Sequence, residues 1–395
     1  MDFSILWYIP IFMISLVFVA VVIPSIVRVA NKIHLFDAHD GRKVHSGEVS
    51  RLGGISFLPA ILFTLLVVLA VMTRFLPQDF HVEFIPYTEI MMAAAGCILL
   101  YLGGLMDDVI GVSYKSKFLL QILASCLLCC SGLYISDLHG ILGIHALHPV
   151  IGVPLTIIVI VFIVNSINLI DGIDGLASGL SILAGVGFVY MFKRIGMNMV
   201  LALDMSMLGV MLMFYLYNTL GKPGVTKIFM GDTGSLTIGF IIAFFTLKLC
   251  CFETPSGIPS SEQLFVYGIS MILVPVMDVF RVFIDRIREG RNPFTPDKKH
   301  IHHKLMAMGF SMRKTRWIIF AMNVVFIMIN ILMSFVLELD INFVILTDLA
   351  IWILFNMYLT RRITPTLKFF LRVCIFGVAL HIGSAEWVSS CSLWR

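Results

Sequence analysis

The stretch Asn168-Leu-Ile-Asp171-Gly-Ile-Asp174-Gly-Leu176 ends a long apolar run with one amide and two carboxylates. On a helix of 3.6 residues per turn, steps of three residues place Asn168, Asp171 and Asp174 on one broad face. Gly172 and Gly175 lack a Cβ, so the backbone can unwind there or a bulky anion can come close. Charges beside hydrocarbon are costly and tend to be functional. We therefore expect these three side chains to converge on one site; the alternative is a helix cap with two chance acids in a loop.

The composition identifies a membrane protein. Hydrophobic residues make up 59% of the 395 residues and charged residues 13%, with a mean hydropathy of +0.98, whereas soluble domains carry about 25% charged residues. The net charge of +4 is small, so composition gives no case for a nucleic-acid partner. The eight cysteines lie almost entirely in apolar runs and are interpreted as small apolar fillers.

Runs of about twenty apolar residues are long enough to cross a bilayer. They predict an all-α polytopic bundle of about eleven transmembrane helices in a single domain, 1–395, with its core at about 5–360 and a basic, partly apolar tail at 361–395. The predicted spans are 5–27, 53–73, 89–106, 118–135, 150–167, 176–192, 199–217, 233–252, 265–284, 317–336 and 343–360. A shorter run at 369–383 is interpreted as an interfacial segment or a weak twelfth element.

Lysine and arginine in the short loops predict the orientation. One set of alternate loops carries most of them, including the loops at 28–51 and 286–316, and the opposite set holds only Arg74, Lys193 and Arg194. The first set is therefore expected in the cytoplasm and the N-terminus outside. The acidic motifs and the histidines at 300–303 fall on the basic side, at helix ends, which favours an interfacial active site.

Two further acidic motifs are candidates for catalysis. Asp107-Asp108 closes the third predicted span; adjacent helical residues point about 100° apart, so we expect divided roles, unless the pair is only a solvated helix end. The turn Gly231-Asp232-Thr-Gly234 begins the eighth span, where backbone N–H groups suit a phosphate and an Asp suits Mg²⁺. An ordinary Asp N-cap is the alternative for Asp232.

Basic residues and histidines form two loops on the same side. His300, His302 and His303 lie among lysines and arginines, which favours binding of an anion such as a diphosphate; a transition-metal site and a plain basic loop are the alternatives. The first loop carries Lys43 and its neighbours ahead of Gly53-Gly54, and these cations either anchor the helix or grip an anionic lipid or nucleotide. The candidates in that loop are Lys43, His45 and Arg51.

Carboxylates for a divalent ion and cations for phosphates, together at the membrane surface, indicate phosphoryl transfer between a nucleotide and a lipid phosphate. A secondary transporter with acidic ion sites is the alternative from another class, although the sequence shows no convincing internal repeat.

The motifs, taken as a set, resemble the polyprenyl-phosphate N-acetylhexosamine-1-phosphate transferases. The similarity extends over about 5–360 and is strongest to the bacterial undecaprenyl-phosphate N-acetylglucosamine-1-phosphate branch. The motifs that carry it are Asp107-Asp108, NLIDGIDGL (168–176), YN (217–218), KIFMGDTGS (227–235), PF-x-PD-x-x-HIHH (293–303) and RKVH…RLGG (42–54).

The resemblance implies transfer of N-acetylglucosamine-1-phosphate from UDP-N-acetylglucosamine to undecaprenyl phosphate, with release of UMP, at the cytoplasmic face of the bacterial inner membrane. It implies Mg²⁺ as cofactor, with Mn²⁺ as an alternative ion, and a homodimer as a candidate assembly. Another UDP-N-acetylhexosamine, or UDP-N-acetylmuramoyl-pentapeptide, is the alternative donor. By position, Asp107 and Asp108 resemble the catalytic acids, and Asn168 and Asp232 the metal ligands. The implied substrate contacts are Lys43, His45, Arg51, Asp171, Asp174, Asn218, Lys227, His300, His302 and His303.

Overall fold

The computed structural model describes residues 8–33, 49–75, 87–254, 259–292 and 299–380, and the side chains only to residue 362 in the last of these ranges. The described chain is almost entirely helical, as predicted. Its elements are α1 (Tyr8–Lys32), η2 (Leu52–Ser56), α2 (Phe57–Phe75), α3 (Tyr87–Ile110), α4 (Tyr114–Cys130), β1 (Asp137–Ile141), β2 (Ile144–Ala146), α5 (Pro149–Ile170), α6 (Leu176–Arg194), α7 (Asn198–Leu220), α8 (Gly231–Cys250), α9 (Ser261–Ser270), α10 (Leu273–Arg288), α11 (Ile301–Ala307), α12 (Met312–Ile331), η3 (Leu332–Val336) and α13 (Ile341–Leu380).

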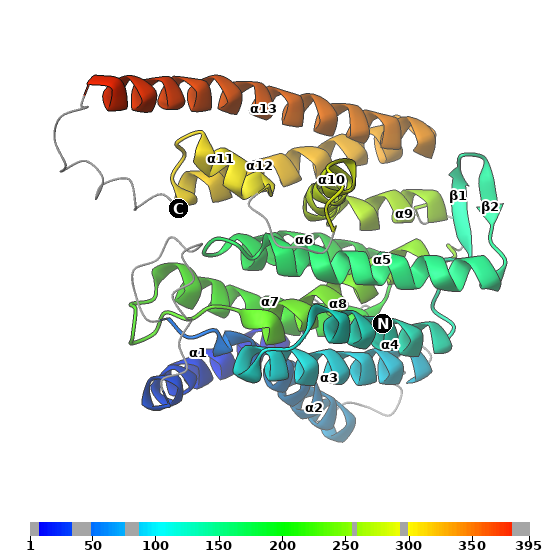
Figure 1. Cartoon of the computed structure of the whole chain (residues 1–395). Coiled ribbons are helices and arrows are strands. Elements are labelled where there is room, and N and C mark those ends of the chain that lie inside the picture. Colours follow the sequence, from blue (N-terminus) through cyan, green and yellow to red (C-terminus); the bar gives the residue numbers. More distant parts are fainter. Residues whose placement is uncertain (1–7, 34–48, 76–86, 255–258, 293–298, 381–395) are drawn as a thin grey trace.

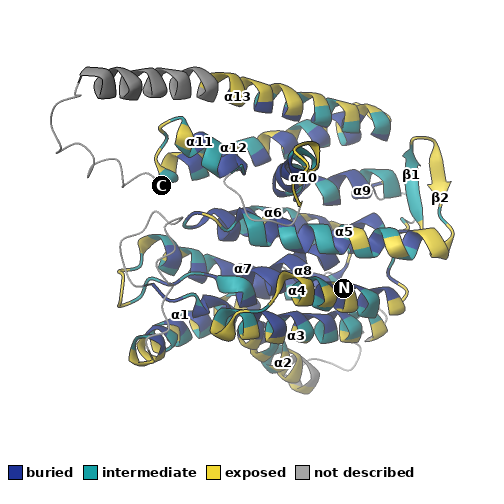
Figure 2. Cartoon of the chain, viewed as in Figure 1, coloured by how far each residue is buried: buried dark blue, intermediate teal, exposed yellow. Residues whose placement is uncertain are grey.

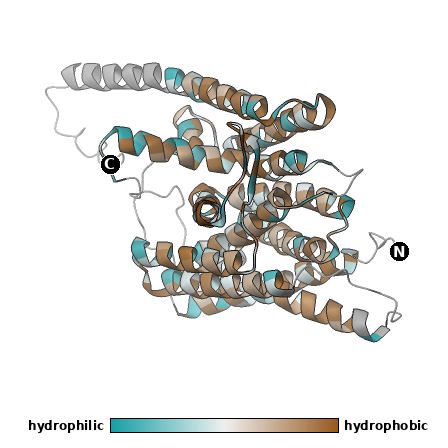
Figure 3. Ribbon diagram, turned by 90° about the vertical axis from the view of Figure 1, so that its right-hand side faces the viewer, coloured by the Kyte–Doolittle hydropathy of each residue, from teal (hydrophilic) through white to brown (hydrophobic). Residues whose placement is uncertain are grey.

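The helices are stacked in layers around α8 (Figure 1). Helix α8 packs against α3, α5 and α9, and almost all of its residues are buried. Figure 2 shows buried residues at the centre and exposed residues on the outer helices. Many of those exposed residues are large and apolar, such as Leu66, Met91 and Leu354, and apolar colour runs along most helices in Figure 3. This outward-facing apolar surface is what a hydrocarbon environment requires.

Each of the eleven predicted spans coincides with a helix or a helix pair. Nine helices among the described residues are long and apolar enough to cross a membrane, and ten if α9 and α10 together form one span. Helix α4 has 17 residues and is the shortest of the eleven regions. The protein is therefore a multi-pass membrane protein.

Three details differ from the prediction. The ninth span is broken, because α9 and α10 meet at a bend of 69°. The run at 369–383 is not a separate element, since α13 continues through it to Leu380; residues 381–383 lie outside the described part. An antiparallel hairpin of β1 and β2, which the sequence did not predict, joins α4 to α5. The homodimer stays a prediction.

Candidate active site

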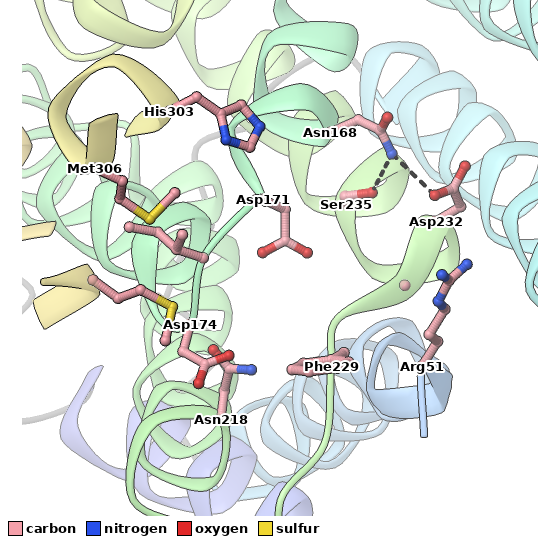
Figure 4. A pocket seen from close by; sticks show the side chains of 14 residues that line it. Arg51, Asn168, Asp171, Asp174, Asn218, Phe229, Asp232, Ser235, His303 and Met306 are labelled. Carbon is pink, nitrogen blue, oxygen red and sulfur yellow. Dashed lines mark hydrogen bonds between the residues drawn. The ribbon is translucent and has the colours of Figure 1, made fainter. Parts of the chain in front are cut away.

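A cavity of about 200 Å³ opens where the ends of α5, α7 and α8 meet the start of α11. Figure 4 shows the side chains that line it, with Asp171 pointing into the open space. Some of the predicted site residues line this cavity, namely Arg51, Asn168, Asp171, Asp174, Asn218, Asp232 and His303. The structure therefore brings together seven predicted residues from five separate stretches of the sequence.

The central motif converges as predicted, but not on a helical face. Helix α5 ends at Ile170, and Asp171 is its C-cap with ψ of 46°. A turn follows, and α6 begins after Gly175, which has φ of +74°. Only Asn168 is helical, so the prediction of one helical face for all three residues was wrong. The glycines permit this turn, because Gly175 adopts a left-handed conformation that other residues rarely take.

The turn is held from three sides. Lys227 donates from Nζ to Asp174 Oδ2 at 2.7 Å, and Arg316 donates to the Asp174 carbonyl oxygen at 2.7 Å. Asn218, only 4% exposed, accepts from the Gly175 N–H at 2.6 Å and donates to the Ile228 carbonyl oxygen at 2.9 Å. Asn218 is thus a structural link between the turn and the segment leading into α8, because both its polar atoms are engaged.

Three carboxylates meet beside this cavity. Oxygen atoms of Asp107, Asp108 and Asp232 lie within 4.8 Å of one another. Lys117 Nζ lies between two of them, 2.7 Å from Asp107 Oδ2 and 2.5 Å from Asp232 Oδ2. Asn168 donates from Nδ2 to Asp232 Oδ1 at 3.2 Å and to Ser235 Oγ at 2.8 Å. The cluster therefore joins the ends of α3, α4, α5 and α8.

Asp107 and Asp108 have different partners, as their helical directions predict. Asp108 accepts hydrogen bonds from the backbone N–H groups of Asp232 and Thr233 at 2.8 and 2.9 Å, and from Thr233 Oγ1 at 2.6 Å. It thus caps the N-terminus of α8 from another helix. Asp107 instead pairs with Lys117 and accepts from the Val112 N–H at 2.7 Å. Asp232 does not cap its own helix, since the N-cap is Met230.

Close backbone approach allows this arrangement. A Cβ at Gly104 would lie 2.6 Å from Thr233 Cα, and a Cβ at Gly54 would lie 2.0 Å from the Gly234 nitrogen. The chain at Ser50 pairs in parallel with Ile228, and the Gly53 N–H donates to the Phe229 carbonyl oxygen at 3.0 Å. These glycines let η2 and α3 lie directly against the start of α8.

The three histidines occupy different surroundings. His300 and His302 are 4% and 1% exposed, and only His303 lines the cavity. His300 Nδ1 lies 2.9 Å from Asp278 Oδ2, and its ring stacks on that of His302 at 5.9 Å. His302 in turn contacts the ring of His303 at 4.2 Å. A row of rings therefore connects the buried carboxylate of Asp278 to the cavity.

His302 is neutral at ordinary pH. Its two ring nitrogens have no hydrogen-bond partner among the described residues, and a Cβ at Gly172 would lie 2.3 Å from Nε2. Burial, followed by the charge of His303, lowers the pKa of His302 to about 3. His302 therefore acts as a packing partner for the turn at 171–175.

Two residues with clear contacts were not among the predicted site residues. Lys117 lies at the centre of the carboxylates, and Arg316 holds the turn at Asp174 while its guanidinium lies 5.4 Å from the Tyr215 ring centroid. Lys117 lies one turn into the helix that follows Asp107-Asp108, and this position is the sequence feature that could have indicated its contact with the carboxylates. Lys43 and His45 lie outside the described residues, as do residues 293–298 of the histidine loop.

Comparison with known proteins identifies the family. The model of glycosyl transferase family 4 matches residues 90–250. A Bacillus subtilis (strain 168) protein named a probable undecaprenyl-phosphate N-acetylglucosaminyl 1-phosphate transferase is 31% identical over 92% of this chain and 96% of its own length. The undecaprenyl-phosphate alpha-N-acetylglucosaminyl 1-phosphate transferases of Escherichia coli (strain K12) and Yersinia pestis are 31% and 28% identical, each over 73% of both chains.

The chain belongs to glycosyl transferase family 4. It is a phospho-sugar transferase, and these matches confirm the resemblance that the sequence motifs indicated. The family match covers α3 to α8 and thus includes the carboxylate cluster and the turn at 171–175.

The donor atoms of this transferase fit a hard divalent cation. Carboxylate oxygens of Asp107 and Asp232 face each other across a shared cation, Lys117. The Asn168 carbonyl oxygen accepts no hydrogen bond among the described residues, because only its Nδ2 is engaged. Asp108 is less suited, since its two oxygens already accept three hydrogen bonds. Oxygen ligands of this kind are those that Mg²⁺ prefers.

Proposed function

We propose that this protein transfers N-acetylglucosamine-1-phosphate from UDP-N-acetylglucosamine to undecaprenyl phosphate, releases UMP and so begins a lipid-linked cell-envelope glycan. The observation that carries the proposal is the convergence of Asp107, Asp108 and Asp232 beside a cavity lined by polar and cationic groups. The names of the relatives support the lipid and the sugar.

The cavity residues suit a sugar nucleotide. Arg51 and His303 line it and can bind phosphates through charge or hydrogen bonds. Asn168 and Asp171 also line it and can accept hydrogen bonds from sugar hydroxyls. Phe229, which also lines the cavity, offers an aromatic face for a base. The donor therefore enters with its diphosphate toward the carboxylate cluster.

The reaction needs little proton transfer. An oxygen of the lipid phosphate attacks the β-phosphorus of the donor, a new phosphorus–oxygen bond forms, and the bond from that phosphorus to the bridging oxygen of UMP breaks. A phosphate monoester has its second pKa near 6 and is largely dianionic at pH 7. Asp107, ion-paired with Lys117 at 2.7 Å, therefore serves to orient the acceptor.

Asn168 and Asp232 are the proposed ligands for Mg²⁺, with Asp107 adjacent. When bound, Mg²⁺ supplies positive charge that offsets the charge on the diphosphate. Lys117 keeps the two carboxylates of Asp107 and Asp232 together, since like charges so close would otherwise repel.

The proposed location is the bacterial inner membrane, with the site on the cytoplasmic side and the N-terminus outside. The excess of Lys and Arg in the loops on the side of the carboxylates supports this orientation. UDP-sugars are made in the cytoplasm, so the donor would reach the cavity from that side.

One assay tests the proposal. Purified protein in detergent, given undecaprenyl phosphate and Mg²⁺, should release UMP from UDP-N-acetylglucosamine, and EDTA should stop the release until Mg²⁺ is added back. A secondary transporter would release none. Competition by the C4-epimeric donor and by UDP-N-acetylmuramoyl-pentapeptide, scored by kcat/KM, identifies the sugar. A preference for either competitor would keep the reaction class and replace the donor.

A further inference from the structure

A second cavity, of about 610 Å³, lies between α10, α11 and α13. It shares no lining residue with the cavity of the carboxylates. Helix α11 stands between them, because His303 and Met306 line the first and Lys304 lines the second. In Figure 1 this region lies above α5 and α6, whereas α3, α4 and α8, which carry the three carboxylates and Lys117, lie below them.

Both long walls of the second cavity change from apolar to cationic in the same direction. On α10 the apolar lining residues are Met277, Phe280 and Ile284, and Arg288 ends the wall; Arg281 and Asp285, which are paired with each other, lie between them. These residues recur at steps of three and four, so they lie on one face of the helix. The wall on α10 thus has an apolar end and a charged end.

The wall on α13 repeats this order. Leu349, Ile353 and Met357 come first, and Thr360 and Arg361 follow at the far end. Lys304 Nζ donates to Thr360 Oγ1 at 3.4 Å, which places Lys304 at the cationic end as well. An elongated apolar surface with several cations at one end matches the shape and charge of a lipid with an anionic head group.

Cations exceed carboxylates in this lining. Arg281, Arg288, Lys304 and Arg361 line it together with one acid, Asp285. Arg281 is committed to Asp278 and Asp285 at 2.7 and 3.2 Å. Arg288 and Arg361 form no ion pair with any described residue. Burial, followed by the charge of Arg281, lowers the pKa of Lys304 to about 8.

We propose that this cavity, the basic groove, binds one anionic phospholipid of the leaflet beside the basic loops. Its phosphate contacts Arg288, Lys304 and Arg361, and its acyl chains lie along α10 and α13. Phe280, Ile353 and Met357 are 47%, 52% and 47% exposed, so the apolar end opens outward, toward hydrocarbon. Charge complementarity selects an anionic lipid over a zwitterionic one.

The lipid substrate is a poorer occupant of the basic groove. Its phosphate must reach the carboxylate cluster for the proposed reaction, and the groove is lined by none of the residues around that cluster. A phospholipid, by contrast, needs no access to the chemistry. Because Lys304 and His303 are neighbours on α11, a bound phospholipid would also hold in place the helix that presents His303 to the sugar-nucleotide cavity.

Native mass spectrometry of the purified protein tests this proposal without any turnover. Phosphatidylglycerol and phosphatidylcholine with identical acyl chains are titrated separately. We expect one phosphatidylglycerol to bind at least roughly tenfold more tightly than phosphatidylcholine, and the double variant Arg288→Gln/Arg361→Gln to lose that preference. The variant Ile353→Trp, which fills the apolar end at an exposed position, should weaken binding of both lipids.

The matched control is Lys32→Gln/Lys222→Gln, which removes two exposed lysines elsewhere on the basic side and should bind phosphatidylglycerol as the wild type does. Equal binding of the two lipids, or full retention of the preference in Arg288→Gln/Arg361→Gln, would overturn the proposal. So would stoichiometric displacement of phosphatidylglycerol by undecaprenyl phosphate, which would assign the groove to the acceptor, or equal competition by inorganic phosphate. Failure of the transferase assay would leave these binding results unaffected.

Discussion

The ammonium group of Lys117 lies between two carboxylates, and this position determines how Asp107 and Asp232 can act. With distances of 2.7 Å or less, this cation offsets the negative charge of both side chains. Both acids are therefore suited to hold a cation or to orient a substrate. Asp108 differs from them, because its oxygens accept hydrogen bonds from the start of α8.

Asp232→Asn should lower kcat by at least roughly 100-fold at every Mg²⁺ concentration, because the substitution removes one negative charge from the proposed cation site and the amide binds Mg²⁺ more weakly than a carboxylate does. The measurement is UMP release across a Mg²⁺ titration. Glu338→Gln, at an exposed position far along the chain, is the control and should retain full activity. If Asp232→Asn turned over like the wild type, Asp232 would not be a ligand of the metal.

Gly172→Ala should lower both thermal stability and activity, because its Cβ would lie 2.3 Å from His302 Nε2 and would push the ring row away from the cavity. Overpacking of this kind typically costs about 1–3 kcal/mol. His302→Ala removes the obstacle, so the double variant Gly172→Ala/His302→Ala should be more stable than the sum of the single losses predicts. Strict additivity in thermal melts of the four proteins would show that the two residues do not touch.

The sequence predicted which residue types gather but not how the backbone brings them together. Asn168, Asp171 and Asp174 were expected on one helix; the chain instead turns at Asp171, because Gly175 can adopt positive φ. The sequence position of Lys117 does not mark it as a site residue, since positively charged residues near helix ends are common on the cytoplasmic side. Only the distances to Asp107 and Asp232 distinguish it from a lysine that merely anchors a helix.

At the scale of elements, the hydropathy pattern predicted the position of each membrane span but not the bend between α9 and α10. The bend of 69° between α9 and α10 falls at Met271 and Ile272, which are both apolar, so mean hydropathy does not reveal it. The short helix α11 and the hairpin of β1 and β2 are likewise below the length at which an apolar pattern is informative. The short helix α11 carries His302 and His303, and α10, which follows the bend, forms one wall of the basic groove.

The contact between α3 and α8 depends on a carboxylate that caps a neighbouring helix. Asp108→Ala should leave two backbone N–H groups and Thr233 Oγ1 without their acceptor, at a cost of about 1–3 kcal/mol. Thr233→Val removes only one of these hydrogen bonds and should cost about 1 kcal/mol. Thermal melts in detergent, with kcat measured in parallel, test whether Asp108→Ala is more destabilising than Thr233→Val. If Thr233→Val proved the more damaging variant, the cap would not be the main link between the helices.

For the whole molecule, one buried histidine makes stability depend on pH. The pKa of His302 is about 3 in the folded protein and about 6.5 in an unfolded chain. Between these values the unfolded state binds a proton that the folded state does not, so stability rises with pH across pH 3–6.5 and is lost as the pH falls.

Acidification from pH 7 to pH 5 should therefore lower the melting temperature, with His302 contributing up to about 2 kcal/mol of the loss. His302→Phe, which keeps a ring but cannot titrate, should reduce this pH dependence. His145→Gln, at an exposed position on β2, should leave it unchanged. The comparison of the three melting curves at pH 7, 6 and 5 decides the matter, because an equal fall of melting temperature in His302→Phe and in the wild type would show that His302 is protonated alike in both states. In that case the loss of stability at low pH would have to come from titratable groups other than His302.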